Sequence, residues 1–474
     1  MKSPWKASHR RLRWVGAAAL AAVAVFLVSC GGSDDAPAAD TAQAKPNIIF
    51  ILQDDQGWGD VGYHSADIQT PTLDRMARQG VELNRYYTYA VCSPTRAALM
   101  SGHSSLETGV DAPISPNESL PLGLTLLPQQ LKTQGYQTVM IGKWHLGQSR
   151  TEAMPFRRGF DHFYGFLSGF EDHYTRINAE GQYDWQRNGT NVVETGHSTD
   201  LLAAESIRMI KARDKTKPLF MYLAFDAPHT PLQAPEAYML RNAHITDINR
   251  RTFAAMLQQQ DDQIARILAT LEAEGMTQNT LIVWASDNGH QNNSGGSAGG
   301  LRGLKGTSFE GGQRVPALAY WPGTLQAGTK LETMVSVLDW FPTLSKLAGA
   351  AVPADPIIVG RDVMPALRGQ TMAAGPTVVL GNRNNRIPDY YESAYQMPWK
   401  LVRLPTFLVT GVGAVPQPPY PKTVYLFNVL TDPNETTDVS AANPAVVTQL
   451  LADLNAAPRA ARTLSEWPVG FVPN

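Results

Sequence analysis

Short apolar runs alternate along the chain with longer stretches whose apolar residues recur at helical spacing. Four runs are apolar at nearly every position, which is typical of strands buried on both faces. They span residues 48–52, 138–141, 219–225 and 281–285. Between the last two, apolar residues recur every three or four positions from Phe253 to Leu271 and predict a long helix. Such strands in alternation with helices predict an α/β fold, with a mostly parallel sheet covered by helices on both faces.

The C-terminal part of the chain has a different character. Residues 369–376, GQTMAAGP, are mostly small residues, glycine and proline, and we place a domain boundary there. Short strand-like pieces such as residues 425–429 follow, and the last of them ends in a turn at residues 431–434. We therefore expect a large domain over residues 46–370 and a smaller C-terminal domain over residues 371–474.

Ionisable or metal-binding side chains follow each of the four strand-like runs. In open parallel sheets, ligands bind outside the carboxyl ends of the strands, where all of these side chains would meet. We expect one site at that edge, built from Asp54, Asp55, Lys143, His145, His229, Asp287 and Asn288.

Three of these residues are carboxylates, and their proximity needs a counter-charge. Each pair at about 4 Å repels by on the order of 4 kcal/mol at an effective dielectric constant of about 20, so three pairs approach the whole stability of a domain. Protonation or a bound cation would relieve this repulsion. Asp54, Asp55, Asp287 and Asn288 offer only oxygen ligands, which favours Ca²⁺ or Mg²⁺ over zinc. Each pair alone is more simply a turn; the combination favours a metal site.

Composition and charge narrow the class of protein. Of the 474 residues 43% are hydrophobic, as in globular proteins with a substantial core, and the formal net charge is −2. So small a charge gives no reason to expect a nucleic-acid partner. Any charged site must therefore be local.

The first 45 residues form no part of the predicted fold. A basic leader is followed by an apolar run that ends in Leu27-Val28-Ser29-Cys30, which resembles the lipobox of bacterial lipoproteins. We expect a signal peptide over residues 1–29, a lipidated Cys30 and a flexible tether over residues 30–45. The protein would then reach the periplasm or outer membrane of a Gram-negative bacterium, held to the membrane only by its lipid anchor. The alternative is an ordinary signal peptide with an incidental cysteine.

Cys92 is the second of the two cysteines. If Cys30 carries lipid, no disulfide can form, and a lone thiol in an exported protein is either buried and inert or chemically employed. Pro94, two residues further on, places Cys92 at the mouth of a helix. A helix N-terminus favours an anion by only about 0.3–1 kcal/mol, so Arg96, Lys143 and Lys305 would have to supply the remaining attraction.

Two motifs carry a resemblance to a known family. Cys92-x-Pro94-x-Arg96, followed by Ala-Ala-Leu-Met-Ser-Gly, resembles the signature of formylglycine-dependent sulfatases, and residues 142–147, GKWHLG, resemble their second signature. The resemblance runs from residue 46 to at least residue 369, and residues 432–435, DPNE, resemble the family's C-terminal turn. It implies an alkaline-phosphatase-like sandwich, in which helices flank a large, mostly parallel sheet and a smaller C-terminal domain contains a short antiparallel sheet.

Within the family, the chain is similar to the arylsulfatase B, or N-acetylgalactosamine-4-sulfatase, branch. The similar stretches are residues 157–161, 169–174, 302–306 and 309–312. That branch acts on sulfated aminosugars in glycan chains. The resemblance therefore implies a sulfated carbohydrate as substrate, such as a fragment of a glycosaminoglycan or another polysaccharide.

The resemblance also implies a modified residue and a metal. A maturation enzyme would oxidise Cys92 to formylglycine, whose hydrate attacks sulfur and whose second hydroxyl then allows sulfate to leave. The implied metal is Ca²⁺, with Mg²⁺ as the alternative. Its ligands would be Asp54, Asp55, Asp287, Asn288 and an oxygen of the modified residue 92.

Five other residues receive roles from the resemblance. Arg96 would hold the formylglycine hydrate, and Lys143 and Lys305 would grip the sulfate. His229 would lie near the leaving oxygen, and His145 would take a proton from the hydrate. Singly, His145 could be a satisfied structural histidine and Lys305 a solvated surface charge. Only the joint pattern favours catalysis.

Three further residues are hypothesised to line the substrate cleft: Asp172, His173 and His290. The chain departs from the family pattern at His290, and also where Thr95 replaces the usual Ser and His103 the usual Arg. None of these departures touches the residues assigned to the metal or to the nucleophile.

Two rival interpretations stay open at the level of sequence. The first is a phosphate or phosphonate monoester hydrolase of the same superfold; such enzymes often use two metals, whereas the sequence offers one set of oxygen ligands. The second is a surface glycan-binding lipoprotein without turnover, which would follow if Cys92 is never oxidised.

Overall fold

The computed structural model describes residues 45–354, 358–383, 390–405 and 421–460. The expected signal peptide, Cys30 and the tether up to residue 44 lie outside this part of the chain. Among the described residues, no helix combines the length and the apolar character needed to cross a membrane.

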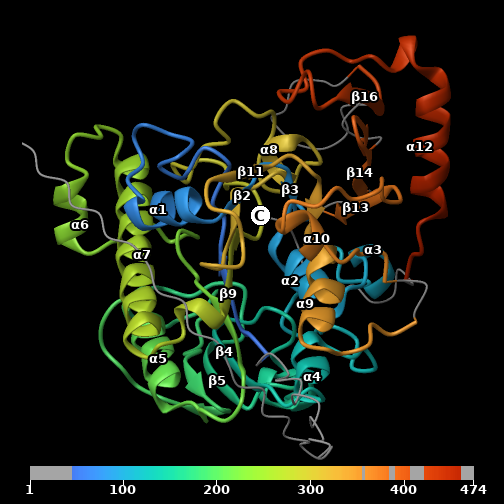
Figure 1. Cartoon of the computed structure of the whole chain (residues 1–474). Helices are drawn as coiled ribbons and strands as arrows, with labels where there is room; N and C mark the ends of the chain where they lie inside the picture. Colours follow the sequence, from blue (N-terminus) through green and yellow to red (C-terminus); the bar gives the residue numbers. More distant parts are fainter. Residues whose placement is uncertain (1–44, 355–357, 384–389, 406–420, 461–474) are drawn as a thin grey trace, which may run out of the picture. The chain divides into compact units, whose positions relative to one another are not determined.

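A ten-stranded sheet forms the centre of the fold (Figure 1). Its five middle strands are parallel neighbours. In spatial order they are β9 (Thr280–Ser286), β1 (Asn47–Gln53), β8 (Leu219–Ala224), β4 (Gln137–Lys143) and β5 (His162–Phe166). Four of them contain the predicted apolar runs, except that β8 ends one residue before its run does, and the expectation of a mostly parallel sheet is confirmed.

Both edges of this sheet contain antiparallel pairs. Beyond β9 the order continues through β10 and β2 to β11, and beyond β5 through β6 to β7. The bounds of these strands are Ala317–Tyr320 for β10, Val81–Leu83 for β2, Thr329–Leu331 for β11, Gln186–Arg187 for β6 and Thr190–Asn191 for β7. A separate pair joins β3 (Tyr86–Tyr87) to β12 (Val335–Ser336).

Side chains of the parallel strands alternate between two hydrophobic cores, one on each face of the sheet. In β1, Ile48, Phe50 and Leu52 belong to one core, and Ile49 and Ile51 belong to the other. The first core is covered by α2 (Cys92–Ser101), α4 (Leu127–Lys132) and α9 (Trp340–Leu347). The second is covered by α1 (Pro71–Gln79), α5 (Ser198–Ala212) and α7 (Ile248–Ala273). Burial on both faces explains why these strands are apolar throughout.

The long helix α7 contains the predicted stretch from Phe253 to Leu271 and extends it at both ends. Its start is set by Asp247, whose side chain accepts a hydrogen bond from the backbone N–H of Arg250. The other α-helices among the described residues before the C-terminal sheet are short: α3 (Ser105–Thr108), α6 (Glu236–Arg241), α8 (Glu310–Gln313) and α10 (Met364–Leu367).

A four-stranded antiparallel sheet follows α10, as the resemblance implied. Its strands are β13 (Val378–Arg383), β14 (Tyr390–Gln396), β15 (Trp399–Arg403) and β16 (Val424–Asn428), each paired with the next. One face packs against α12 (Pro444–Ala456) through Leu450 and Leu454, and the other packs against Phe309. The domain boundary near residue 370 stays a prediction.

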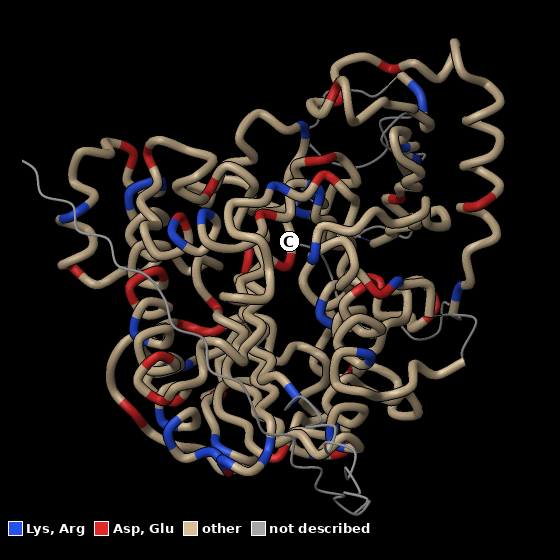
Figure 2. Tube along the Cα trace, viewed as in Figure 1, with Lys and Arg blue, Asp and Glu red and all other residues tan. Residues whose placement is uncertain are grey.

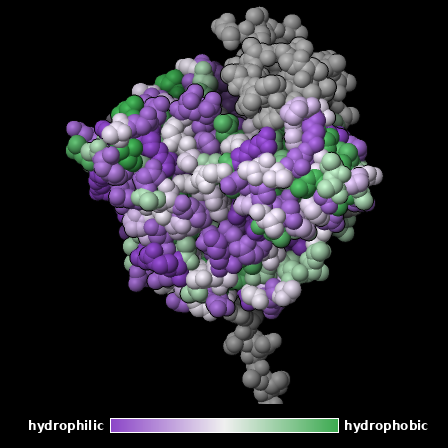
Figure 3. All heavy atoms as spheres, turned by 90° about the horizontal axis from the view of Figure 1, so that it is seen from above, coloured by the Kyte–Doolittle hydropathy of each residue, from purple (hydrophilic) through white to green (hydrophobic). Residues whose placement is uncertain are grey.

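Charged residues of both signs are spread along the described chain (Figure 2), in keeping with the net charge of −2. On the face drawn in Figure 3, apolar residues form small groups among polar ones.

Candidate active site

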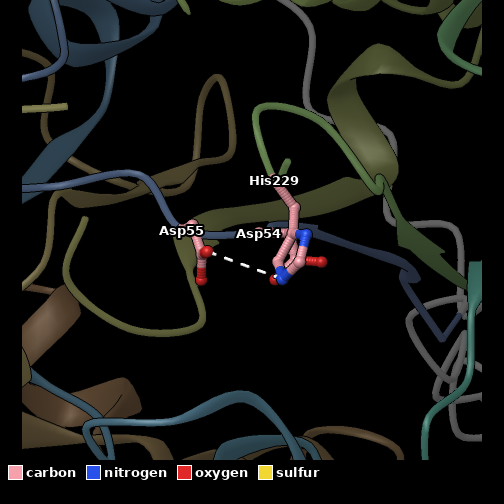
Figure 4. A group of neighbouring side chains, drawn as sticks. All are labelled: Asp54, Asp55 and His229. Atoms are coloured by element: carbon pink, nitrogen blue, oxygen red, sulfur yellow. Dashed lines mark ion pairs between the residues drawn. The ribbon is translucent and has the colours of Figure 1, made fainter. Parts of the chain in front are cut away.

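The side chains expected to meet at one edge of the sheet do meet there. The consecutive strands β9, β1, β8 and β4 are parallel, so their carboxyl ends lie at the same edge. Residues that end or follow these strands at that edge are Asp54, Asp55, Lys143, His145, His229, Asp287 and Asn288. Figure 4 shows Asp54, Asp55 and His229 gathered together, with a dashed line for the ion pair between His229 and Asp55.

The backbone turns sharply where these strands end. Asp55 and His145 have φ values of 67° and 52°, a left-handed conformation that residues other than glycine seldom adopt. Gly142 has a φ of 104°, and a Cβ atom there would lie 1.8 Å from the backbone oxygen of Ala224 on β8. Such backbone strain is concentrated at functional sites, because there it aims side chains that regular structure would not.

Each of the three carboxylates pairs with a cation of the protein. The distances are 2.5 Å between Asp54 Oδ2 and Lys143 Nζ, 2.6 Å between Asp55 Oδ1 and Lys305 Nζ, and 2.8 Å between Asp287 Oδ2 and Arg96 Nη2. These three side chains offset the repulsion among the carboxylates that the sequence predicted, so charge balance alone does not require a bound ion.

Two buried oxygens make a stronger case for a cation. Among the described residues, Asp54 Oδ1 and Asn288 Oδ1 have no hydrogen-bond partner. An unsatisfied buried acceptor costs about 1–3 kcal/mol, which a bound cation would offset. Asp54, Asp55 and His229 each also offer a ligand atom, and these atoms lie within 4.8 Å of one another. The residues present therefore fit a metal ion.

Asp287 is differently placed from the other expected ligands. Its Oδ1 accepts the backbone N–H of Asp55, and its Oδ2 accepts two bonds from Arg96. Burial and the charge of Asp54 raise the pKa of Asp287 well above its ordinary value. Burial also acts to raise the pKa of Asp54, but Lys143, His229 and Arg96 outweigh it and hold that pKa low.

Cys92 is the first residue of α2 and lies within reach of a base. Its Sγ is 3.2 Å from His145 Nδ1, and its side chain is buried. Burial, together with the charges of Lys143 and Arg96, holds the pKa of His145 well below its ordinary value. A neutral imidazole at this distance can accept a proton from residue 92.

Arg96 joins α2 to the residues at the strand ends, and its side chain lies behind the site in the protein interior. The side chain is fully buried, and its Nη1 donates to the backbone oxygen of Lys143 at 3.1 Å and to Tyr222 Oη at 3.4 Å. With the bonds to Asp287, the guanidinium contacts a residue of β4, a residue of β8 and the residue that follows β9. Arg96 thereby fixes the position of residue 92 relative to the carboxylates.

A cleft of about 700 Å³ opens over this cluster. Cys92, His145, His229 and Lys305 line it, so four of the six side chains assigned to catalysis by the resemblance reach the cleft. The other two, Arg96 and Lys143, are fully buried behind it.

His173 does not line the cleft, contrary to the sequence hypothesis. Its side chain is buried; Nδ1 lies 2.9 Å from Asp226 Oδ2 and Nε2 lies 3.2 Å from the backbone oxygen of His229. Both ring nitrogens are therefore occupied. The imidazole supports the segment that carries His229 instead of facing a substrate.

Asp172 and His290 are also absent from the lining of the cleft. The carboxylate of Asp172 accepts the backbone N–H groups of Tyr174 and Thr175 and the side-chain amide of Gln233, so it shapes its own loop. The backbone oxygen of His290 accepts the N–H of Lys305 at 2.9 Å. These two residues hold other parts of the site in place.

Asp226 and Phe170 are among the residues of the site that were not singled out from the sequence. Asp226 follows β8 closely, as Asp54 follows β1, and this position at a strand end was the signal for it. Phe170 lines the cleft. It belongs to the stretch 169–174 that resembles known sulfatases, but no periodicity or charge marks it.

Comparison with known proteins agrees with this geometry. The sulfatase family model matches residues 46–350. The chain is 36% identical to arylsulfatase J of Mus musculus, over 89% of this chain and 77% of that protein. It is 32% identical to N-acetylgalactosamine-6-sulfatase of Canis lupus familiaris, over 85% of this chain and 83% of that protein.

A solved structure shows the same fold. The crystal structure of Ps i-CgsB in complex with k-i-k-neocarrahexaose superposes with a TM-score of 0.79 at 31% identity, covering 87% of this chain and 92% of that chain. The family match spans the strand ends and the segment of Cys92 alike. This chain therefore belongs to the sulfatase family and is a sulfuric ester hydrolase.

Proposed function

We propose that the protein removes sulfate from a sulfated carbohydrate, using residue 92 in its formylglycine form and one divalent cation, Ca²⁺ in preference to Mg²⁺. The observation that carries the proposal is the position of Cys92. Its side chain lines the cleft, 3.2 Å from the neutral base His145, at the edge where the carboxylates and Lys305 gather.

The carbohydrate substrate is supported by two relatives. One is named N-acetylgalactosamine-6-sulfatase, and the solved structure of Ps i-CgsB holds a neocarrahexaose. An open cleft of about 700 Å³ is also large enough to receive a sugar ring beside the sulfate.

Asp54, Asp55 and Asn288 would hold the cation, with Asp287 and an oxygen of residue 92 as the further expected ligands. The buried oxygens of Asp54 and Asn288 that accept no hydrogen bond support this assignment; Arg96 Nη2 lies 3.8 Å from the oxygen of Asp54. All the groups are hard oxygen donors, which suit Ca²⁺. When bound, the cation withdraws charge from the sulfate oxygens, where charge increases in the transition state.

Residue 92 would supply the nucleophile. As formylglycine it provides an aldehyde hydrate, a nucleophile with a second hydroxyl for the release of sulfate. His145 Nδ1 is placed to take the proton from this residue. Arg96 keeps α2, and therefore residue 92, at a fixed distance from the strand ends.

Lys305 and His229 would act on the sulfate ester itself. Both line the cleft, and both lie beside Asp55, with Lys305 Nζ at 2.6 Å and His229 Nε2 at 3.7 Å. The ammonium group of Lys305 attracts the sulfate anion and is placed to donate a proton to the departing oxygen. Burial lowers the pKa of His229 to about 4, so its imidazole is neutral and would serve the departing oxygen as a hydrogen-bond partner. Lys143 is buried against Asp54 and would contribute its charge from behind the carboxylates.

Turnover of matched esters tests the proposal. We expect purified protein from its native host to hydrolyse 4-nitrophenyl sulfate much faster than 4-nitrophenyl phosphate, and to release sulfate from some member of a panel of defined sulfated sugars. Preferred cleavage of the phosphate would identify a phosphomonoester hydrolase instead. Sulfate release from the aryl ester alone would overturn the carbohydrate assignment.

We also propose that the protein is exported and lipidated at Cys30, and that a formylglycine-generating enzyme matures it. The support is the sequence of the leader and the identity of residue 92. Cys30→Ser is expected to release the protein from the membrane fraction without changing its specific activity. Equal membrane association of wild type and variant would contradict the lipid anchor.

A further inference from the structure

Phe170 is an exposed aromatic ring at the cleft. Its side chain is 37% exposed, whereas its neighbours Ser168 and Glu171 are 2% and 1% exposed. Phe170 lines the same cleft as Cys92. A large apolar side chain that is exposed at a cleft either has no function there or contributes to ligand binding.

The position of Phe170 relative to the reacting groups favours binding. Its ring is stacked on the imidazole of His229, with centroids 5.5 Å apart and planes inclined by 20°. The residue before it, Gly169, lies against His145, since a Cβ atom there would be 2.8 Å from two atoms of that imidazole. The imidazole of His229 thus lies between the ring of Phe170 and the carboxylate cluster. A sugar whose oxygen lies near His229 has to pass close to it.

The loop that carries Phe170 is firmly held. The backbone N–H groups of Leu167 and Ser168 donate to the carboxylate of Asp184 at 2.8–3.1 Å. Arg176 is fully buried beneath the loop, where its guanidinium stacks on Trp185 at 4.7 Å. A side chain on so well-anchored a loop is preorganised, and binding to it costs little ordering entropy.

The remaining lining of the cleft suits a ring with one apolar face and polar edges. Gln148, Glu180, Gln291 and Asn292 all line it and can bond to hydroxyl groups. A pyranose of galactose configuration has such a shape, because its axial 4-hydroxyl leaves the C–H groups at C3, C4 and C5 uninterrupted on the opposite face. Flat aromatic rings pack well against C–H surfaces of this kind.

We infer that Phe170 is the platform for the sugar that carries the scissile sulfate, and that it selects a galactose-configured ring. The inference rests on the proposed function and deepens it. The ring of Phe170 would cover the C–H face of the sugar, and the stack with His229 would align the leaving oxygen with that imidazole.

The test compares Phe170→Ala, Phe170→Leu and Phe170→Tyr with wild type. The probes are sulfated methyl galactosides and their glucose epimers. Loss of the flat ring should raise KM for the preferred galactoside about tenfold in the Ala and Leu variants, the loss of a buried apolar contact worth about 1.4 kcal/mol. kcat should change less than KM. Phe170→Tyr should restore KM and the preference for the galactose epimer.

Tyr174→Ala is the matched control. Tyr174 is an exposed aromatic residue of the same loop, at 43% exposure, but it is not part of the lining of the cleft. It should behave like wild type with every probe.

Three results would overturn the inference while leaving the proposed function intact: an unchanged KM in Phe170→Ala, a wild-type KM in Phe170→Leu, or a loss confined to kcat. A loss confined to kcat would show that Phe170 only positions the imidazole of His229. A wild type that desulfates none of these sugars but acts on another member of the panel of sulfated sugars would overturn the inference alone. A wild type that releases sulfate from no member of the panel would overturn the proposed function and the inference together.

Discussion

At the scale of single residues, the site depends on small residues as much as on charged ones. Gly169 has no side chain, and this lets the loop before Phe170 lie directly on the ring of His145. The imidazole in turn stands 3.2 Å from residue 92. A methyl group at position 169 would therefore displace the imidazole of His145 and change its contact with residue 92.

We predict that Gly169→Ala lowers kcat about tenfold or more while the melting temperature changes little. The added Cβ would lie 2.8 Å from the ring, which has to move, and a displacement near 1 Å of a reacting group can cost about a hundredfold. Gly123→Ala is the control, because a Cβ there meets nothing within 4 Å. Wild-type kinetics in Gly169→Ala would show that His145 does not act on residue 92.

Residues at the strand ends could be predicted from sequence, because the geometry of a parallel sheet decides where they go. Asp54 and Asn288 are of this kind. His173 and Asp172 could not be placed, since the direction of a side chain in an irregular loop depends on partners such as Asp226 and Gln233 that no local pattern reveals. The pairing of each carboxylate with a lysine or arginine was hidden for the same reason.

At the scale of elements, buried charges join segments that lie far apart in the sequence. Helix α1 has no side-chain cap of its own at Thr70. Instead, the carboxylate of Asp261 on α7 accepts the N–H groups of Thr72 and Leu73, each at 2.9 Å. Burial raises the pKa of Asp261 to about 6, although these two hydrogen bonds act to lower it.

The raised pKa of Asp261 predicts the sign of a pH effect on stability. Between the unfolded pKa of about 3.8 and the folded value of about 6, the folded protein binds more protons than the unfolded chain, so stability falls as pH rises through this range. The loss is on the order of 3 kcal/mol. Asp261→Asn should remove this slope from the free energy of unfolding measured in urea.

The neighbouring residue provides the control for that measurement. Asp262 pairs with Arg241 at the surface, and Asp262→Asn should change stability by less than about 1 kcal/mol at every pH. Parallel profiles for wild type and Asp261→Asn would contradict the role assigned to Asp261.

A second buried cluster joins the C-terminal sheet to the segment that carries Lys305. Lys400 on β15 lies 3.1 Å from Glu310 Oε1 on α8 and 2.9 Å from Glu435 Oε1, and all three side chains are buried. The backbone N–H of Glu310 also donates to Glu435 Oε2 at 2.6 Å. Glu435 belongs to the DPNE turn that resembles the sulfatase pattern, and this contact gives the turn a structural role.

We predict that Lys400→Met lowers the free energy of unfolding by about 3–5 kcal/mol, because it removes the nearest cation from two buried carboxylates. Glu435 loses the cation at 2.9 Å, and Glu310 keeps the more distant Arg314, at 3.7 Å. Urea denaturation measures this loss. The same substitution at Lys422, whose pair with Asp438 is partly exposed, should cost less than about 1 kcal/mol. Equal losses of unfolding free energy in the two variants would show that the buried cluster contributes no more to stability than the partly exposed ion pair.

At the scale of the whole molecule, the sheet brings residues from distant parts of the chain to one edge. Asp55 and Asn288 are separated by more than two hundred positions in the sequence, yet the side-chain amide of Asn288 donates to Asp55 Oδ1 at 2.7 Å. The fold class followed from the apolar runs, because burial on both faces leaves a clear pattern. The contacts that join the C-terminal sheet to the segment of Lys305 could not be predicted, because a single charged residue such as Lys400 forms no recurring pattern in the sequence.

A cation at this edge should stabilise the whole fold. We predict that Ca²⁺ added to protein treated with a chelator raises the melting temperature by roughly a few degrees, since a ligand at about 100 times its Kd contributes about 2.7 kcal/mol. Asn288→Ala should lose most of this shift, whereas Asn249→Ala, at an exposed position on α7, should keep it. A full shift in Asn288→Ala would remove Asn288 from the ligands.

The proposed reaction requires residue 92 as a modified nucleophile. Peptide mass spectrometry over residues 91–96 of protein from its native host detects this modification. We expect residue 92 to have lost its sulfur and to carry an aldehyde. An unmodified thiol in protein that still releases sulfate would exclude formylglycine as the nucleophile.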